Sequence, residues 1–103
     1  MKRQDLDNMA ALDLFDRAMK EYEDMPLGDR QYTRLRYTQA DVCETPNFYV
    51  LRSYWTFVAA IEKSTGYCAD MLRKEYGYTA TSAQHIAKFM SDYGDRIRLY
   101  RWR

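Results

Sequence analysis

Few side chains of this 103-residue chain could act as nucleophiles, bases or metal ligands: it has one histidine, His85, and two cysteines, Cys43 and Cys68. A structural zinc site needs four Cys, His or carboxylate ligands at suitable spacing, and these three residues are widely separated. Cys68 with His85 has the residue types of a nucleophile–base pair, but nothing in the sequence orients them. We therefore predict a protein that is not an enzyme, with no catalytic residues, no metal site and no cofactor.

The sequence also lacks the patterns of phosphate-binding loops and of membrane segments. Its four glycines are scattered rather than grouped into a phosphate-cradling loop. No apolar run approaches the length of about 18 residues that spans a bilayer. Cys43 and Cys68 could form a disulfide, but the absence of an apolar secretory leader favours two reduced thiols. We expect a cytoplasmic protein that does not bind membranes.

Arginine and aromatic residues interleave along several segments, and this is the strongest chemical pattern in the chain. The residues concerned are Arg34, Arg36, Arg52, Tyr54, Trp55, Arg98, Tyr100, Arg101 and Trp102. Sheets that present arginine beside stacking aromatics bind single-stranded nucleic acid. One reading is therefore a small nucleic-acid-binding accessory protein, although the net charge of +1 is low for a dedicated binder.

The net charge conceals a strong asymmetry along the chain. Residues 1–29 carry a net charge of −4, whereas residues 30–103 carry +5. The acidic side chains that lie mainly off the apolar face of the first expected helix are Asp13, Asp16, Glu21, Glu23 and Asp24. A negatively charged helix can dock on a basic surface and compete with nucleic acid, or it can simply be a solvated face. We expect these carboxylates to form a candidate partner-binding surface.

Two helices are expected to position these groups. Leu12, Phe15, Met19 and Tyr22 recur at the helical period, which predicts an amphipathic helix over 6–25 that ends before Pro26. Thr81 to Gln84 fits a capping box, which predicts a second helix over 82–93.

The remaining segments are read as strands and connections. We predict strands at 30–38, 48–61, 67–72 and 96–103, with 48–61 divided by a turn near 52–55, a loop at 39–47, a hairpin connection at 63–66 and a polar loop at 73–78. The chain is then one domain, 1–103, with an acidic helical part at 1–29 and a basic β-rich part at 30–103. The predicted class is α+β, an antiparallel sheet of about four to five strands covered on one face by both helices.

About half of the chain, 49–94, resembles a small uncharacterised domain that is common in bacteriophages and mobile elements. The matching residues are Tyr49 to Tyr54, Thr56, Val58, Ala59, Ile61 and Gly66, followed by Tyr78 to Ser82, His85, Ile86 and Phe89. Trp55, Phe57 and the insert 67–77 depart from the family pattern. The family has no assigned chemistry to transfer. The resemblance implies a phage or prophage origin, and small phage proteins often bind and block a host protein, as anti-CRISPR proteins do.

Two binding functions are therefore expected. The first is a non-enzymatic phage-type inhibitor that binds a host protein or ribonucleoprotein complex in the bacterial cytoplasm. The alternative is direct nucleic-acid binding through the arginine–aromatic residues. The sequence leaves open a monomer or a homodimer, the latter formed through the arginine-rich C-terminal strand as an exposed sheet edge.

Overall fold

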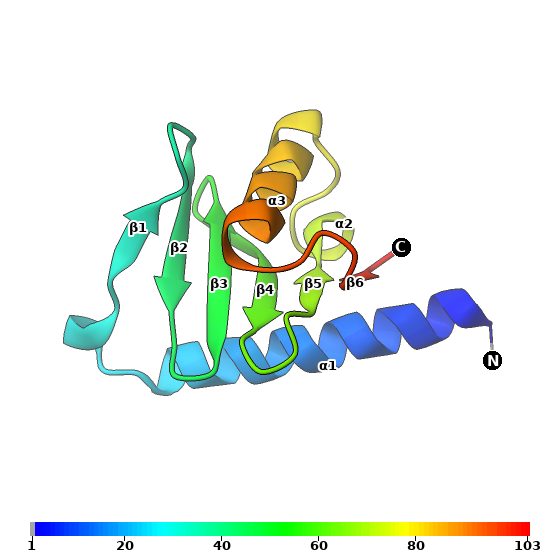
Figure 1. The fold of residues 1–103 in the computed structure, drawn as a ribbon, viewed down its shortest axis with the longest axis horizontal. Coiled ribbons are helices and arrows are strands. Elements are labelled where there is room, and N and C mark those ends of the chain that lie inside the picture. The colour runs from blue at the N-terminus through cyan, green and yellow to red at the C-terminus, as the bar shows by residue number, and fades with distance from the viewer. Residues whose placement is uncertain (1) are drawn as a thin grey trace.

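A computed structural model describes residues 2–103, in which a long helix, α1 (Arg3–Asp24), crosses the strands of a six-stranded sheet (Figure 1). The helix buries one face, formed by Ala11, Leu14, Phe15, Ala18 and Tyr22. Their spacing of three to four residues confirms the predicted amphipathic period. The helix ends at Asp24 because Pro26 disfavours helical backbone at Met25, whose ψ is 137°. A single 3-10 turn, η1 (Leu27–Asp29), leads into the sheet.

The strands lie in the sheet in the order of the sequence. They are β1 (Tyr32–Arg34), β2 (Ala40–Glu44), β3 (Phe48–Ser53), β4 (Thr56–Glu62), β5 (Cys68–Asp70) and β6 (Leu99–Arg101). The α+β class is confirmed, with six strands. The predicted loop at 39–47 is wrong, because β2 begins directly after a tight turn. That turn is closed by the Thr38 hydroxyl, which donates to the Leu35 carbonyl at 2.6 Å.

The last strand differs in direction from the prediction. Neighbouring strands from β1 to β5 are antiparallel, but β6 pairs parallel with β5. A parallel pair needs a crossover of about a dozen residues or more. Two helices supply it, α2 (Leu72–Glu75), where a polar loop was predicted, and α3 (Ala80–Tyr93).

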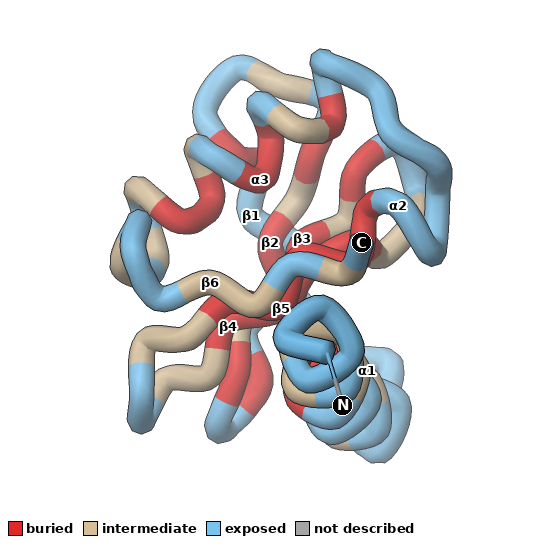
Figure 2. The backbone as a smooth tube through the Cα atoms, turned by 90° about the vertical axis from the view of Figure 1, so that its right-hand side faces the viewer, coloured by how far each residue is buried: buried red, intermediate tan, exposed pale blue. Residues whose placement is uncertain are grey.

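The two long helices cover opposite faces of the sheet, so the prediction that both cover one face is wrong (Figures 1 and 2). Successive strand residues point to opposite faces. Val50 and Ala60 pack in the cluster that contains α1, while Leu51 and Ala59 pack in the cluster that contains α3. A sheet that is buried on both faces reads as a continuous apolar run rather than an alternating one. The stretch 58–61 has this pattern, since all four residues are buried.

The start of α3 is fixed two residues earlier than predicted. The N-cap is Thr79, whose Oγ1 accepts a hydrogen bond from the Ser82 backbone N–H at 3.1 Å. Thr81, the predicted cap, instead lies inside the first turn. The earlier start of α3 turns Ser82 inward, where it is fully buried against β3.

Candidate functional site

The two cysteines lie in different layers of the molecule. Cys43 packs in the cluster under α1 and Cys68 in the cluster under α3, so the sheet separates them. Both thiols are free and buried, and burial raises the pKa of each. A raised pKa disfavours the thiolate, which is the nucleophilic form of cysteine.

His85 pairs with serines rather than with a cysteine. Its Nδ1 lies 2.8 Å from Ser53 Oγ, and Ser53 Oγ lies 3.0 Å from Ser82 Oγ. Burial, together with the positive charge of Lys88, lowers the pKa of His85 and favours the neutral ring. Ser53 and Ser82 are fully buried. The three side chains therefore act as a polar clamp that joins α3 to the end of β3.

Other site types are not formed by the part of the chain that the structure describes. Within residues 2–103, no group of three His, Cys, Asp or Glu side chains is arranged to hold a metal ion. No helix of that part combines the length and apolar character required to cross a membrane.

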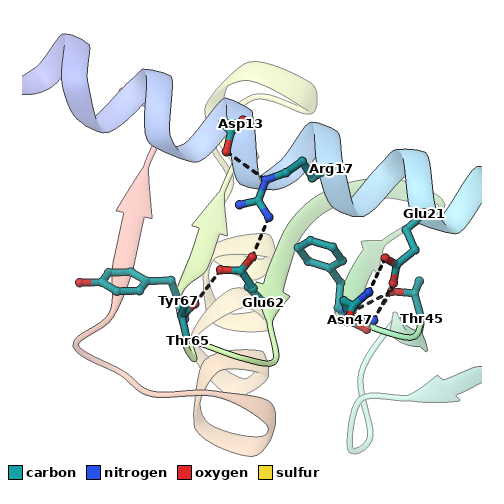
Figure 3. A network of polar contacts seen from close by, with 9 residues as sticks. Asp13, Arg17, Glu21, Thr45, Asn47, Glu62, Thr65 and Tyr67 are labelled. Atoms are coloured by element: carbon teal, nitrogen blue, oxygen red, sulfur yellow. Dashed lines mark hydrogen bonds and ion pairs between the residues drawn. The ribbon is translucent and has the colours of Figure 1, made fainter.

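Two of the predicted acidic residues are engaged inside the molecule (Figure 3). Asp13 accepts a hydrogen bond from Arg17, whose other end reaches Glu62 of β4 at 2.6 Å. Glu21 accepts hydrogen bonds from the Thr45 hydroxyl and from the backbone N–H of Asn47, at 2.7 and 2.6 Å. Burial raises the pKa of Glu21, but these hydrogen bonds lower it overall. Glu21 thus anchors α1 to the sheet directly, whereas Asp13 orients Arg17, which makes the contact with β4.

The other predicted acidic residues are free to meet a partner. Asp16, Glu23 and Asp24 are exposed on α1 and form no ion pair with any of residues 2–103. They give the solvent side of this helix a surplus of negative charge.

The predicted arginine–aromatic residues at the C-terminus do not form an exposed stacking surface. Tyr100 stacks on Tyr67 with ring centroids 4.5 Å apart, and both pack with Trp102 against the cluster beneath α1. Arg98 donates to the Thr65 carbonyl at 2.6 Å, and Arg101 pairs with Asp70 at 3.1 Å. The rings that were predicted to stack on bases are used for packing instead.

The predicted arginines of the first hairpin are also separated from one another. Arg34 is exposed at the end of β1, whereas Arg36, in the following turn, forms a two-pronged ion pair with Asp92 of α3 at 2.7 and 2.9 Å. The nine residues therefore do not form one sheet face. Arg52 and Trp55 are brought together at the β3–β4 hairpin, where Tyr54 turns toward His85 instead. Arg36 and Arg101 line one cavity beside α3.

Beside this hairpin lies a row of arginine and aromatic side chains that we name the aromatic–arginine ladder, formed by Arg30, Tyr22, Tyr32, Arg52 and Trp55. The Arg52 guanidinium carbon lies 4.1 Å from the Tyr32 ring centroid and 4.8 Å from that of Trp55. The Tyr32 and Tyr22 hydroxyls share a hydrogen bond, and Arg30 lies 4.5 Å over the Tyr22 ring. Each cation–π contact contributes about 0.5–2 kcal/mol, depending on its exposure. The stack holds its members in place before any partner arrives.

The hairpin tip adopts a backbone that its residues do not favour. Tyr54 and Trp55 have φ of 49° and 80°. Two positive φ values in a two-residue hairpin are those of a type I′ turn, which favours Asn-Gly, and a non-glycine residue there costs about 1–3 kcal/mol. Tyr54 turns toward His85, with ring centroids 5.5 Å apart, while Trp55 stacks on Arg52. Trp55 nevertheless remains 82% exposed.

One polar atom within the ladder has no partner. Arg52 Nε is buried and, among residues 2–103, no acceptor lies within hydrogen-bond distance of it. The guanidinium binds Asp41 through its Nη2 atom at 3.2 Å. A buried donor without an acceptor costs about 1–3 kcal/mol.

Sequence reasoning identified Arg52, Tyr54 and Trp55 but missed Tyr22, Tyr32 and Arg30 of the ladder. Tyr32 and Arg34 flank Thr33 in β1 and lie on one face of the strand, as the β1–β2 register shows. What the sequence did not reveal was the contact between the end of α1 and that strand face.

Comparison of this chain with protein-family models, with curated protein sequences and with solved structures finds no match.

Proposed function

We propose that this chain is a non-enzymatic protein that binds a protein partner through the aromatic–arginine ladder, with Trp55 as the central anchor. The observation that carries the proposal is an 82% exposed tryptophan in a strained turn, stacked on a preordered arginine. Tryptophan, tyrosine and arginine dominate the hot spots of protein interfaces. Backbone strain that the fold does not need is typical of functional sites.

The charge around the ladder indicates the chemistry of the partner. Tyr22 belongs to α1, and the exposed carboxylates Glu23 and Asp24 follow it directly in the chain. Within the ladder, Arg52 pairs with Asp41, whereas Arg30 donates to the Met25 and Glu23 carbonyls, which are neutral and leave its charge in place. The exposed carboxylates beside Tyr22 are complementary to a basic rim around an apolar pocket of a partner.

Basic surfaces of this kind occur in proteins that handle nucleic acid. The proposed role is therefore inhibition of a host nucleic-acid-handling protein or ribonucleoprotein complex, in which the acidic side of α1 competes with nucleic acid. The resemblance to a phage domain supports a bacterial cytoplasm as the setting and immune evasion of the anti-CRISPR type as the purpose.

Capture from a nuclease-treated bacterial lysate tests this proposal, because removal of nucleic acid eliminates indirect bridging. Immobilised wild-type protein should retain a specific protein, and Trp55→Ala should weaken its binding about 30-fold, the effect of losing an interface hot spot. Tyr37→Ala is the matched control, since Tyr37 is a fully exposed aromatic residue on the neighbouring hairpin. Retention of nothing, or equal retention by Trp55→Ala, would refute the proposal.

A further inference from the structure

A cavity of about 540 Å³ lies on the face of the sheet opposite the ladder. Its walls come from α3, from β6 and from the segment that follows β5, and its apolar floor includes Leu72, Ile86, Met90 and Leu99. Its charged lining consists of Arg36, Asp70, Arg73, Lys88, Arg96 and Arg101. The volume falls in the range of small-molecule sites, about 300–1,000 Å³.

The cavity lies where parallel sheets place their ligands. Asp70 is the last residue of β5 and Arg101 the last of β6, and these two strands form the one parallel pair among residues 2–103. In open sheets with helical crossovers, ligands bind in the crevice outside the carboxyl ends of the parallel strands. The β5–α3–β6 crossover repeats this arrangement at the edge of an otherwise antiparallel sheet.

The cavity carries a surplus of positive charge. Asp70 is neutralised by Arg101 at 3.1 Å and also accepts a hydrogen bond from the Leu72 N–H at 3.0 Å. Arg36 is paired with Asp92. Arg73, Lys88 and Arg96 have no carboxylate within ion-pair distance among residues 2–103. Three cations without an ion-pair partner among residues 2–103 surround this crevice and favour an anionic ligand.

An exposed aromatic ring completes the site. Tyr78 lines the cavity, is 57% exposed and lies 4.8 Å beneath the Arg73 guanidinium. A ring and an apolar floor beside a cluster of cations suit a ligand that has one planar and one phosphorylated part.

We infer that this cavity binds a nucleotide phosphate, with Arg73, Lys88 and Arg96 contacting the phosphate and Tyr78 contacting the base. The ligand is either a free nucleotide or one nucleotide of a single strand. The site is independent of the ladder, because it lies on the other face of the sheet and shares no residue with it.

Fluorescence anisotropy with a labelled short oligothymidylate tests the inference at about 50 mM salt, where phosphate contacts are strongest. The triple variant Arg73→Ala, Lys88→Ala and Arg96→Ala should bind at least about tenfold more weakly. Its salt slope should fall by about two, since each contact to a single strand contributes about 0.7. Removing unpaired cations leaves no orphaned carboxylate, so the variant should retain the wild-type melting temperature.

Lys20→Ala is the matched control, because Lys20 is an exposed lysine of α1, on the opposite face, that forms no ion pair with any of residues 2–103. The Lys20→Ala variant should bind the oligonucleotide as the wild type does. The single charge reversal Arg96→Glu is a second test, and it should also weaken binding of the oligonucleotide. Competition by AMP and by inorganic pyrophosphate indicates a free nucleotide, whereas binding of the oligomer without such competition indicates a strand. No binding of any probe, or equal binding by wild type and both variants, would overturn the inference.

Discussion

At the scale of one residue, Arg52 connects the exposed Trp55 to the rest of the ladder. Its guanidinium is fixed between two rings and by Asp41, yet its Nε–H faces no acceptor within residues 2–103. The fixed guanidinium orients the ring of Trp55, which remains 82% exposed.

His85 gives a pH-dependent prediction at the same scale. Burial lowers its pKa below 6.5, so the unfolded chain takes up a proton before the folded one does. The free energy of unfolding should therefore decrease as the pH falls below about 6.5. Urea unfolding between about pH 7.5 and pH 5.5 should show this decrease in the wild type and a nearly flat profile in His85→Asn.

The range from about pH 7.5 to pH 5.5 lies above the pH at which the carboxyl groups with lowered pKa values titrate. The pKa values of Glu21, Glu62 and Asp92 are all lowered from values of 4.5 or 3.8, and the stability that these groups contribute is lost only at lower pH. A parallel decrease in wild type and His85→Asn would show that His85 is not buried as a neutral ring.

At the scale of elements, two threonines at the start of α3 differ in their role: Thr79 caps the helix, whereas Thr81 lies in its first turn. Thr79→Ala removes the acceptor for the Ser82 N–H and should cost about 1 kcal/mol of unfolding free energy. This corresponds to a loss of about 4–8 °C in Tm for a domain of this size. Thr81→Ala should change the stability by less than about 0.5 kcal/mol. The reverse ranking in thermal unfolding would restore Thr81 as the cap.

The end of α3 depends on a close approach to β4. A Cβ on Gly94 would lie 2.9 Å from Ile61 Cδ1, in the core beneath the helix. Gly94→Ala should therefore destabilise the protein by about 1–3 kcal/mol through overpacking. Gly28→Ala is the control, because nothing lies within 4 Å of its Cβ. Valine lacks the Cδ1 methyl that clashes, so adding Ile61→Val to Gly94→Ala should recover part of the lost stability. If the double variant instead lost the sum of the two single losses, this explanation would be contradicted.

Helices were easier to predict than strand directions for a physical reason. Proline at 26 and the threonine-rich start of α3 act within a few residues of the helix ends, so they can be read locally. The parallel pairing of β6 depends on where the crossover places the chain, and the burial of both sheet faces depends on tertiary packing. The uninterrupted apolar stretch 58–61 was the local sign of that burial.

At the scale of the whole molecule, the charge asymmetry of the sequence becomes an asymmetry between two faces. Within the described part of the chain, 2–103, the carboxylates without an ion pair, Asp16, Glu23 and Asp24, lie on α1. The cations without one, Arg73, Lys88 and Arg96, surround the cavity beside α3. The sheet lies between α1 and α3 (Figure 2). One small domain can therefore present opposite potentials to a basic protein and to a phosphate.

The candidate sites could be predicted only in part for a related reason. Arg52 and Trp55 are close in the sequence, so their hairpin and their chemistry were recognisable together. The ladder and the cavity each combine distant segments, such as Tyr22 with Tyr32 and Arg73 with Arg96, and sequence spacing cannot reveal such contacts. Tyr100 and Trp102 had the right residue types but were needed to fill the core beneath α1.

The most direct test of the central claim measures stability and partner capture together for Trp55→Gly. Glycine accepts the φ of 80° without strain, so it removes a cost of about 1–3 kcal/mol while losing a cation–π contact of about 0.5–1 kcal/mol. We predict a free energy of unfolding at least equal to that of the wild type, together with loss of the protein captured from lysate. A destabilised variant that still captures this protein would contradict the account, because Trp55 would then serve the fold and not the partner.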